Sequence, residues 1–257
     1  MDDNIITTSR FERISASLNN SSYRDKIIFF NMGYMPDSKK SETTFKLPDF
    51  LINKNSIRLI LEIIGDTDLK NKNIIDIGCG RGGTIRVVNK YFYPKELAGI
   101  DLSKSSIDYC KASNLDSNAT FYLNAAEKMT FHSQTFDVAL IIEMMDPEPS
   151  SFSIYNETHR VLKEDGLLLQ SGVFKKKNLK ETLEMINTLF TIVLNIDITS
   201  NVLLSAASNF NSRANLLSRI SSDKKMIDDF LIAPRTDYFK LLEKGETEYR
   251  ILKMQKK

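Results

Sequence analysis

A glycine-rich turn at residues 78–83 is the part of this sequence best suited to hold a cofactor. Its order, GCGRGG, directly follows a short apolar stretch that contains the acid Asp76. Glycine has no side chain and adopts backbone angles that other residues avoid, so such a turn lets the backbone approach a nucleotide-like ligand closely. The spacing of Gly78, Gly80 and Gly83 also matches the G-x-G-x-x-G pattern of dinucleotide-dependent oxidoreductases. The turn alone therefore leaves the cofactor open.

Two acids near the turn have the chemistry to bind a nucleoside cofactor. Asp101 ends the next apolar stretch, where an acid hydrogen-bonds ribose hydroxyls or serves as the N-cap of the following helix. Asp76 precedes the first glycine by two residues, and there a carboxylate would repel the pyrophosphate of a dinucleotide. A simpler interpretation of Asp76 is that it caps neighbouring backbone amides.

Alternating apolar patterns predict the elements that position these residues. The expected strands lie at 74–77, 97–101, 119–123, 136–142 and 167–172, and the helices between them at 84–92, 104–112 and 152–162. Such alternation is typical of an α/β protein with a parallel sheet covered on both faces. Two later strands, at 191–199 and 246–255, lack a short crossover and predict an antiparallel edge.

The remaining segments predict a helical cap over this sheet. Residues 1–70 form an expected N-terminal cap or lid that includes a helix over 50–64, and residues 71–257 form the core. A helical insertion at about 200–235 should complete the substrate cap.

Five segments, in matching order and spacing, resemble the motifs of class I S-adenosylmethionine-dependent methyltransferases over about residues 71–174. They are DIGCGRG at 76–82, GIDLS at 99–103, NAAEKMTF at 124–131, FDVA at 136–139 and RVLKEDG at 160–166. The flanking segments NMGYM at 31–35, ITSNVL at 198–203 and YFKLLEKGETEY at 238–249 resemble a narrower group, the phthiotriol and microcystin-tailoring O-methyltransferases. The resemblance implies a seven-stranded Rossmann-like sheet, mostly parallel with an antiparallel last strand, and S-adenosylmethionine as cofactor.

The resemblance also implies a set of cofactor-binding residues. They are Tyr34, Asp76, Gly78, Cys79, Gly80, Asp101, Leu102, Ala125, Ala126 and Glu143. In this set Asp76 and Tyr34 would lie at the cationic methionine end of the cofactor. Ala125 stands where the family has an aspartate that accepts from the adenine amino group, so the side-chain carbonyl of Asn124 or the backbone near Ala126 must replace it.

Catalysis is the least defined part of the prediction. Many related enzymes have a histidine after the fourth strand, and Met145 is nearest to that position here. The closest carboxylates, Glu143 and Asp146, are the candidate catalytic residues, as a general base or as groups that orient the substrate. Both histidines, His132 and His159, fit surface or packing positions better, and no metal site is expected.

These features predict methyl transfer to a small natural-product or lipid-like acceptor, with a hydroxyl as the favoured target. The alternatives are methylation of nitrogen or carbon, a cyclase or binding protein that uses the cofactor structurally, and, less favoured, a dinucleotide-dependent oxidoreductase. A role in secondary metabolite biosynthesis is the expected context.

Bulk composition limits the partners and the compartment. The 257 residues carry a net charge of +2, which gives no electrostatic footprint for nucleic acid. Two cysteines without a signal-like N-terminus favour reduced thiols and a cytoplasmic location. No apolar run approaches the roughly 18 residues of a membrane span. We expect a monomer or homodimer whose ligand is a small molecule.

Overall fold

The structure is a computed structural model that describes residues 3–37, 47, 48, 51, 53–113, 118–144, 147–219 and 236–257. For residues 3–10, 209–213, 216 and 217 only the course of the backbone is described. The predicted catalytic residue Asp146 and its neighbour Met145 lie outside the described residues.

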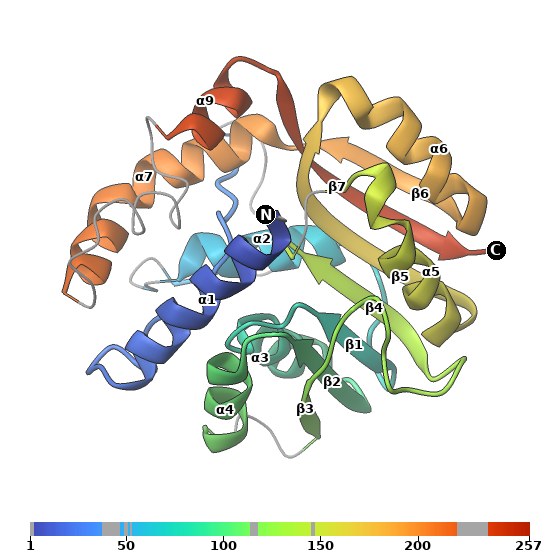
Figure 1. The fold of residues 1–257 in the computed structure, drawn as a ribbon, viewed down its shortest axis with the longest axis horizontal. Helices are drawn as coiled ribbons and strands as arrows, with labels where there is room; N and C mark the ends of the chain where they lie inside the picture. Colours follow the sequence, from blue (N-terminus) through green and yellow to red (C-terminus); the bar gives the residue numbers. More distant parts are fainter. Residues whose placement is uncertain are drawn as a thin grey trace.

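A seven-stranded sheet forms the centre of the molecule, in the order β3-β2-β1-β4-β5-β7-β6 (Figure 1). The strands are β1 (Asn73–Ile77), β2 (Glu96–Asp101), β3 (Ala119–Leu123), β4 (Phe136–Ile142), β5 (Leu162–Lys175), β6 (Phe190–Asp197) and β7 (Thr247–Lys256). The first five pair in parallel, and β7 runs antiparallel to both β5 and β6. The predicted fold class is therefore confirmed. The antiparallel strand, however, lies inside the sheet, because β7 inserts between β5 and the edge strand β6.

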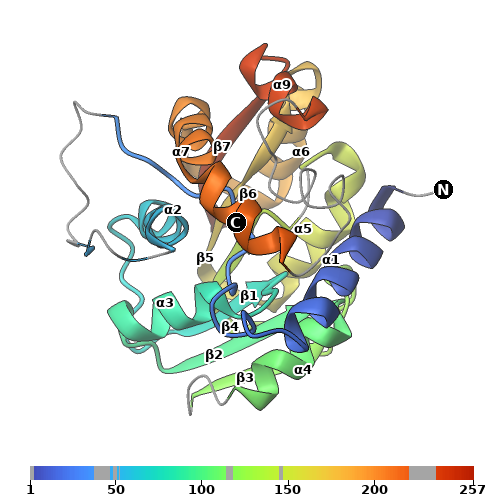
Figure 2. The same ribbon diagram turned by 90° about the vertical axis from the view of Figure 1, so that its left-hand side faces the viewer.

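Helices cover both faces of the sheet (Figures 1 and 2). They are α1 (Asp3–Asn19), α2 (Lys54–Ile64), α3 (Gly83–Phe92), α4 (Lys104–Ala112), α5 (Phe152–Val161), α6 (Leu179–Leu189), α7 (Thr199–Ser218) and α9 (Asp237–Glu243), with short 3-10 turns at Pro149–Ser151 and Lys176–Asn178. One apolar layer joins the sheet to α2, α3, α4, α7 and α9, and a second joins it to α5 and α6. The alternation within β1 explains this arrangement, since Ile74 belongs to the first layer whereas Ile75 and Ile77 belong to the second.

Local differences from the predicted elements have simple physical causes. Helix α6 was not predicted, and among its residues only Thr182 and Ile186 are buried, so its apolar face is narrow. The expected turn at 163–166 lies within β5, because pairing with β4 resumes after a register shift. Asp165, with a φ of 58°, marks that irregularity. Within the expected cap at residues 1–70, the first helix, α1, ends at Asn19, and the predicted helix over 50–64 begins later, at Lys54.

None of the helices in the described residues combines the length and the apolar character that crossing a bilayer needs.

Candidate active site

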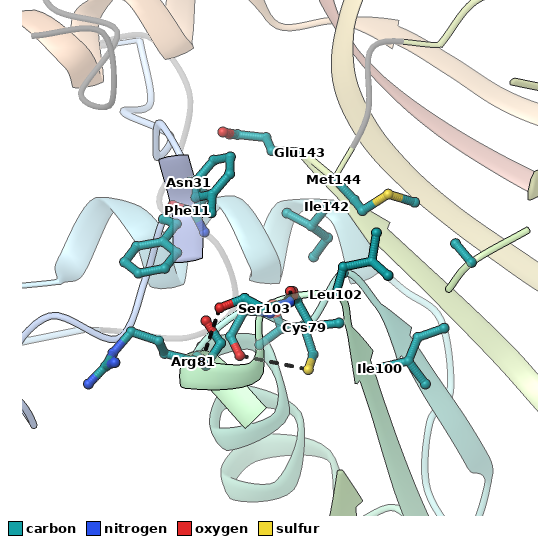
Figure 3. Close-up of a pocket in the computed structure, with 18 of the residues that line it drawn as sticks. Phe11, Asn31, Cys79, Arg81, Ile100, Leu102, Ser103, Ile142, Glu143 and Met144 are labelled. Atoms are coloured by element: carbon teal, nitrogen blue, oxygen red, sulfur yellow. Dashed lines mark hydrogen bonds between the residues drawn. The ribbon is translucent and has the colours of Figure 1, made fainter. Parts of the chain in front are cut away.

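The carboxyl ends of β1, β2 and β4 meet at one edge of the sheet, where the strand order reverses between β1 and β4. Open α/β sheets bind ligands at this switch point. A cleft with an empty volume of about 1060 Å³, including its open side, lies there (Figure 3). It is lined by the glycine turn, the end of β2, the loop after β3, the end of β4 and the N-terminal segment around residues 28–31.

The glycine turn is held in a conformation that glycine favours. Gly78, Gly80 and Gly82 have φ angles of 79°, 50° and 74°, in the left-handed region that other residues rarely adopt. The amides of Gly78 and Cys79 both donate to the Ile100 carbonyl at 2.9 Å, which fixes the turn against β2. A Cβ atom on Gly78 would lie only 2.1 Å from Cγ of Met144, so the Met144 side chain leaves no room for a side chain at position 78.

Asp101 is anchored by the backbone on both sides. Its Oδ2 accepts from the Gly80 amide at 2.8 Å, and its Oδ1 accepts from the Ser103 amide at 2.7 Å. Burial raises the pKa of this carboxyl, whereas the backbone hydrogen bonds from Ser103 and Gly80 oppose that rise. The carboxylate is thereby oriented at the cleft, where its remaining lone pairs can accept from a diol.

Asp76 lies beneath the turn, in the body of β1. It is 1% exposed, and its Oδ2 has no hydrogen-bond partner among the described residues. Burial, with a contribution from the charge of Asp101, raises the pKa of Asp76 to about 8. A buried carboxylate oxygen without a donor is costly, and a cationic ligand group bound nearby would offset that cost. The site therefore fits a cofactor whose end is positively charged.

An apolar wall adjoins the turn. Phe11 of α1, Phe29 and Phe30 of the N-terminal segment, and Ile142 and Met144 at the end of β4 contribute to it. Phe11 and Phe30 pack with ring centroids 5.9 Å apart, and Figure 3 shows Phe11 and Met144 on different sides of the opening. This wall suits an apolar ligand beside the cofactor.

Glu143 connects three separate parts of the chain at the end of β4. Its backbone has a φ of 52°, and its Oε1 accepts from the Met32 amide at 2.8 Å and from the Tyr249 hydroxyl at 2.7 Å. Tyr249 is completely buried on β7 and also lies 3.1 Å from the Ser171 hydroxyl. Glu143 thus lines the cleft while its carboxylate is fixed by two donors.

The structure brings most of the predicted cofactor residues together. Those lining the cleft are Gly78, Cys79, Gly80, Asp101, Leu102, Ala126 and Glu143. Asp76, Ala125 and Tyr34 are not among the described lining residues, and Asp76 lies buried beneath the turn. Tyr34 is instead buried toward α2, and burial together with the nearby charge of Glu62 raises the pKa of its hydroxyl to about 12. Assignment of the predicted residues to the cofactor stays a prediction.

Sequence reasoning missed how α1 joins the site. Glu12 accepts from the Ser103 hydroxyl at 2.7 Å and from the Ser105 hydroxyl at 2.6 Å. Burial raises the pKa of Glu12, but these serine hydrogen bonds outweigh it and lower the pKa overall. Arg81, in the middle of the glycine turn, is completely buried against the segment after α1. The sequence did contain one signal for this contact, because the long charged side chain of Arg81 stands between two glycines of the turn.

The two segments predicted to form a cap contact each other. Ser205 of α7 donates to the Met32 carbonyl at 2.9 Å, and the Asn201 side chain donates to the Met35 carbonyl at 3.0 Å. Gly33 lies so close to α7 that a Cβ there would be 2.6 Å from the Ser205 hydroxyl. The N-terminal segment and α7 therefore pack as one layer beside the cleft.

The histidines lie outside the described lining of the cleft. His159 packs edge-on against Phe190 with centroids 5.6 Å apart, and burial lowers its pKa. His132 contributes its backbone carbonyl, which accepts from the Thr135 hydroxyl at 2.7 Å. No cluster of potential metal ligands occurs within the described ranges.

The chain is similar to known proteins over much of its length. Residues 68–206, more than half of the chain, match a family model described as a methyltransferase domain. A fatty-acid O-methyltransferase from Mycolicibacterium smegmatis is 25% identical over 157 residues, which cover 61% of this chain and 57% of that protein. A phthiotriol/phenolphthiotriol dimycocerosates methyltransferase from Mycobacterium leprae is 24% identical over 230 residues, which cover 88% of this chain and 84% of that protein.

Among solved structures, the crystal structure of the (4+2)-cyclase SpnF has the same fold. Its TM-score is 0.71 at 18% sequence identity, and the superposition covers 97% of this chain and 94% of that one. The matched part of the M. smegmatis relative is little more than half of that protein's length.

Proposed function

Since this chain belongs to the methyltransferase-domain family, we propose that it transfers a methyl group from S-adenosylmethionine to a hydroxyl group of a small, lipid-like or natural-product acceptor. The observation that carries the proposal is the pairing of two different surfaces in one cleft. The glycine turn and Asp101 form the polar surface, with Asp76 buried beneath the turn, and Phe11, Phe29 and Phe30 form the apolar surface. The names of the fatty-acid and phthiotriol relatives support an acceptor of this class.

The residues fit the cofactor in charge and in shape. Asp101 would accept from the ribose hydroxyls, and the exposed face of Leu102 would contact the adenine ring, because this leucine is 52% exposed and lines the cleft. The unpartnered oxygen of Asp76 would compensate the cationic methionine end. When bound, S-adenosylmethionine supplies a methyl group on a positively charged sulfur, which is already activated for displacement.

The contribution of the protein is alignment and exclusion of water. The aromatic wall would hold the acceptor against the cofactor and keep water from the reacting oxygen. Glu143 would take the acceptor proton, oriented by the Tyr249 hydroxyl and the Met32 amide that hold its Oε1. The cap predicted from residues 1–70 and 200–235 would close the acceptor side of the cleft.

Methyl transfer can be measured directly on the full chain. Incubation with methyl-labelled S-adenosylmethionine and a set of fatty acids and hydroxylated lipids should move the label into the lipid phase in the presence of one acceptor class. A label that remains on the cofactor with every acceptor, while the cofactor still binds, would contradict the proposed activity. That result would instead favour the runner-up, a cyclase or binding protein that uses the cofactor structurally, a reading to which the shared fold with SpnF lends weight.

Asn124 is expected to read the adenine amino group in place of the aspartate that the family has at Ala125. Asn124 lines the cleft, and its side-chain nitrogen donates to the Thr130 hydroxyl at 2.7 Å. The side-chain oxygen therefore points away from Thr130 and can accept from a ligand. Replacing Asn124 with alanine should weaken S-adenosylhomocysteine binding by about tenfold, because one hydrogen bond is lost. Calorimetric titration measures the affinity.

Thr130→Val separates this role from a general effect on the loop. It removes the group that orients Asn124 but keeps the size of the side chain, so we expect a smaller loss of affinity in the same direction. Unchanged affinity in Asn124→Ala would show that the backbone near Ala126 recognises the adenine instead.

Replacement of Glu143 by glutamine tests the proposed base. The amide oxygen can still accept from Met32 and Tyr249, so cofactor affinity should stay the same while kcat falls by about 100-fold. Tyr249→Phe, which removes one donor and keeps the carboxylate, should have a smaller effect on kcat. If Glu143→Gln retains full kcat, Glu143 only ties the N-terminal segment to β4, and Asp146 becomes the remaining candidate base.

A further inference from the structure

The Arg81 side chain joins the glycine turn to a segment far away in the sequence. Its Nε donates to the Ile27 carbonyl at 3.1 Å, and its Nη2 donates to the Arg24 carbonyl at 2.9 Å. Its Nη1 donates to the Ser15 carbonyl at 3.3 Å and to the Asn19 side-chain oxygen at 2.7 Å. All four acceptors belong to residues 15–27, which comprise the last turns of α1 and the loop after it.

The environment of the Arg81 guanidinium makes this contact difficult to replace. The side chain is 0% exposed, and the guanidinium carbon lies 3.7 Å from the ring centroid of Tyr109. Burial lowers the pKa of Arg81 to about 10, so the group stays charged at neutral pH. A buried cation without acceptors is costly, and undocking of residues 15–27 would remove all four at once.

The same backbone that carries Arg81 forms the cofactor turn. Arg81 lies between Gly80 and Gly82, whose positive φ values define the turn, and the Gly80 amide is held by Asp101. The direction of the guanidinium and the shape of the turn therefore depend on each other. Loss of the contacts to residues 15–27 would release the turn that the cofactor requires.

The middle of α1 contacts the second side of the cofactor site. Phe11 lines the cleft, and Glu12 holds Ser103, whose amide in turn donates to Asp101. One turn after Phe11 and Glu12, the Ser15 and Ser106 hydroxyls lie 2.7 Å apart, so α1 packs along α4 (Figure 2). One helix is thus bound both to the turn and to the residues around the ribose acid.

We propose that Arg81 is a positioning residue that couples cofactor binding at the glycine turn to the docking of α1. The cofactor site and the side of the cleft that α1 forms with Phe11 are then assembled together. The cofactor side of this coupling rests on the proposed function. The anchoring of residues 15–27 by Arg81 rests only on the contacts described above.

Hydrogen exchange of the full chain, followed by mass spectrometry, tests the coupling. In the wild type, S-adenosylhomocysteine should slow the exchange of amides in residues 11–27. In Arg81→Met the same amides should exchange about tenfold faster without ligand, the ligand should no longer protect them, and its affinity should fall by about tenfold. Arg81→Lys should recover part of both effects, since one ammonium can satisfy some of the carbonyls.

Arg160→Met is the matched control. The Arg160 guanidinium also donates to backbone carbonyls, those of Phe131 at 2.9 Å and Met129 at 3.1 Å, which lie outside residues 11–27. The same charge is lost, so the exchange of residues 11–27 in this variant should match that in the wild type. If Arg81→Met does not fold, Asn19→Ala removes one acceptor of the guanidinium and should show the same changes in weaker form. Amides of β4 and β7 report whether the fold is intact.

Three outcomes overturn the inference. Unchanged exchange of residues 15–27 in ligand-free Arg81→Met shows that the arginine does not anchor them. Reduced affinity without faster exchange places its effect in the turn alone, and absence of ligand protection in a wild type that binds the ligand removes the coupling. A wild type that binds no S-adenosylhomocysteine contradicts the proposed function and the coupling, and the ligand-free comparison of the two proteins then still decides the anchoring.

Discussion

Replacement of Asp101 by alanine should weaken the binding of S-adenosylhomocysteine by about 100-fold, or about 2.7 kcal/mol. The carboxylate is the only group proposed for the ribose hydroxyls. It also holds the amides of Gly80 and Ser103, at 2.8 and 2.7 Å. The variant therefore loses the contacts to the ligand and the backbone bonds that shape the turn. Isothermal titration calorimetry gives the affinity, and thermal unfolding shows whether the sheet remains intact.

Asp108→Ala is the control for this experiment. Asp108 is a carboxylate on the neighbouring helix α4, exposed and paired with Lys104 at 2.5 Å, so its removal changes the charge without touching the cleft. Its affinity should match that of the wild type. An Asp101→Ala protein that binds as tightly as Asp108→Ala would exclude Asp101 from the cofactor site.

Without cofactor, the stabilising contribution of Asp76 should fall as the pH rises from about 4 to about 8, so the stability of the wild type relative to Asp76→Asn should decrease over this range. Folded Asp76 keeps its proton up to a pKa of about 8, whereas in the unfolded chain it releases the proton near its ordinary pKa of about 3.9. The folded state thus binds more protons across this window. The contribution of Asp76 is fully present below the unfolded pKa and is lost as the pH approaches the folded pKa. Urea unfolding of both proteins across the pH range measures the difference.

Binding of the cationic cofactor should shift Asp76 toward its charged form. Near pH 7 this shift should release up to about one proton per ligand bound, and the measured enthalpy should then depend on the ionisation enthalpy of the buffer. In Asp76→Asn this buffer dependence should disappear, and affinity should fall. If the free energy of unfolding of the wild type and of Asp76→Asn changes with pH in the same way, Asp76 is not protonated in the folded chain.

The sheet and the cofactor side of the site could be predicted because local signals specify them. The strand around Asp76 is apolar on both faces, so it had to be central, and the glycines after it occupy positions of positive φ where other residues are disfavoured. Asp101 follows the neighbouring strand, and adjacent parallel strands bring their carboxyl ends together. The predicted family, fold and cofactor are confirmed on this basis.

The contacts between the N-terminal segment and the cofactor site could not be predicted, because they join residues far apart in the sequence. Arg81 meets acceptors that lie 54 to 66 positions earlier, and nothing in the local pattern around residues 15–27 identifies them as acceptors. Tyr34 is turned toward α2 by packing that involves Asn55, whose carbonyl accepts from the Tyr34 amide at 2.9 Å. The motif around Tyr34 predicts a position near the cofactor, and this stays a prediction. The direction of the Tyr34 side chain is set by tertiary packing, which the motif does not contain.

Calorimetric titration of the full chain with S-adenosylhomocysteine and, separately, with NAD tests the central claim most directly. Both ligands carry an adenosine, but only the first ends in an amino acid, whose ammonium group the buried carboxyl of Asp76 fits. We expect saturable binding of S-adenosylhomocysteine and no binding of NAD. Binding of NAD without binding of S-adenosylhomocysteine would contradict the assignment of this cleft as a methyl-donor site.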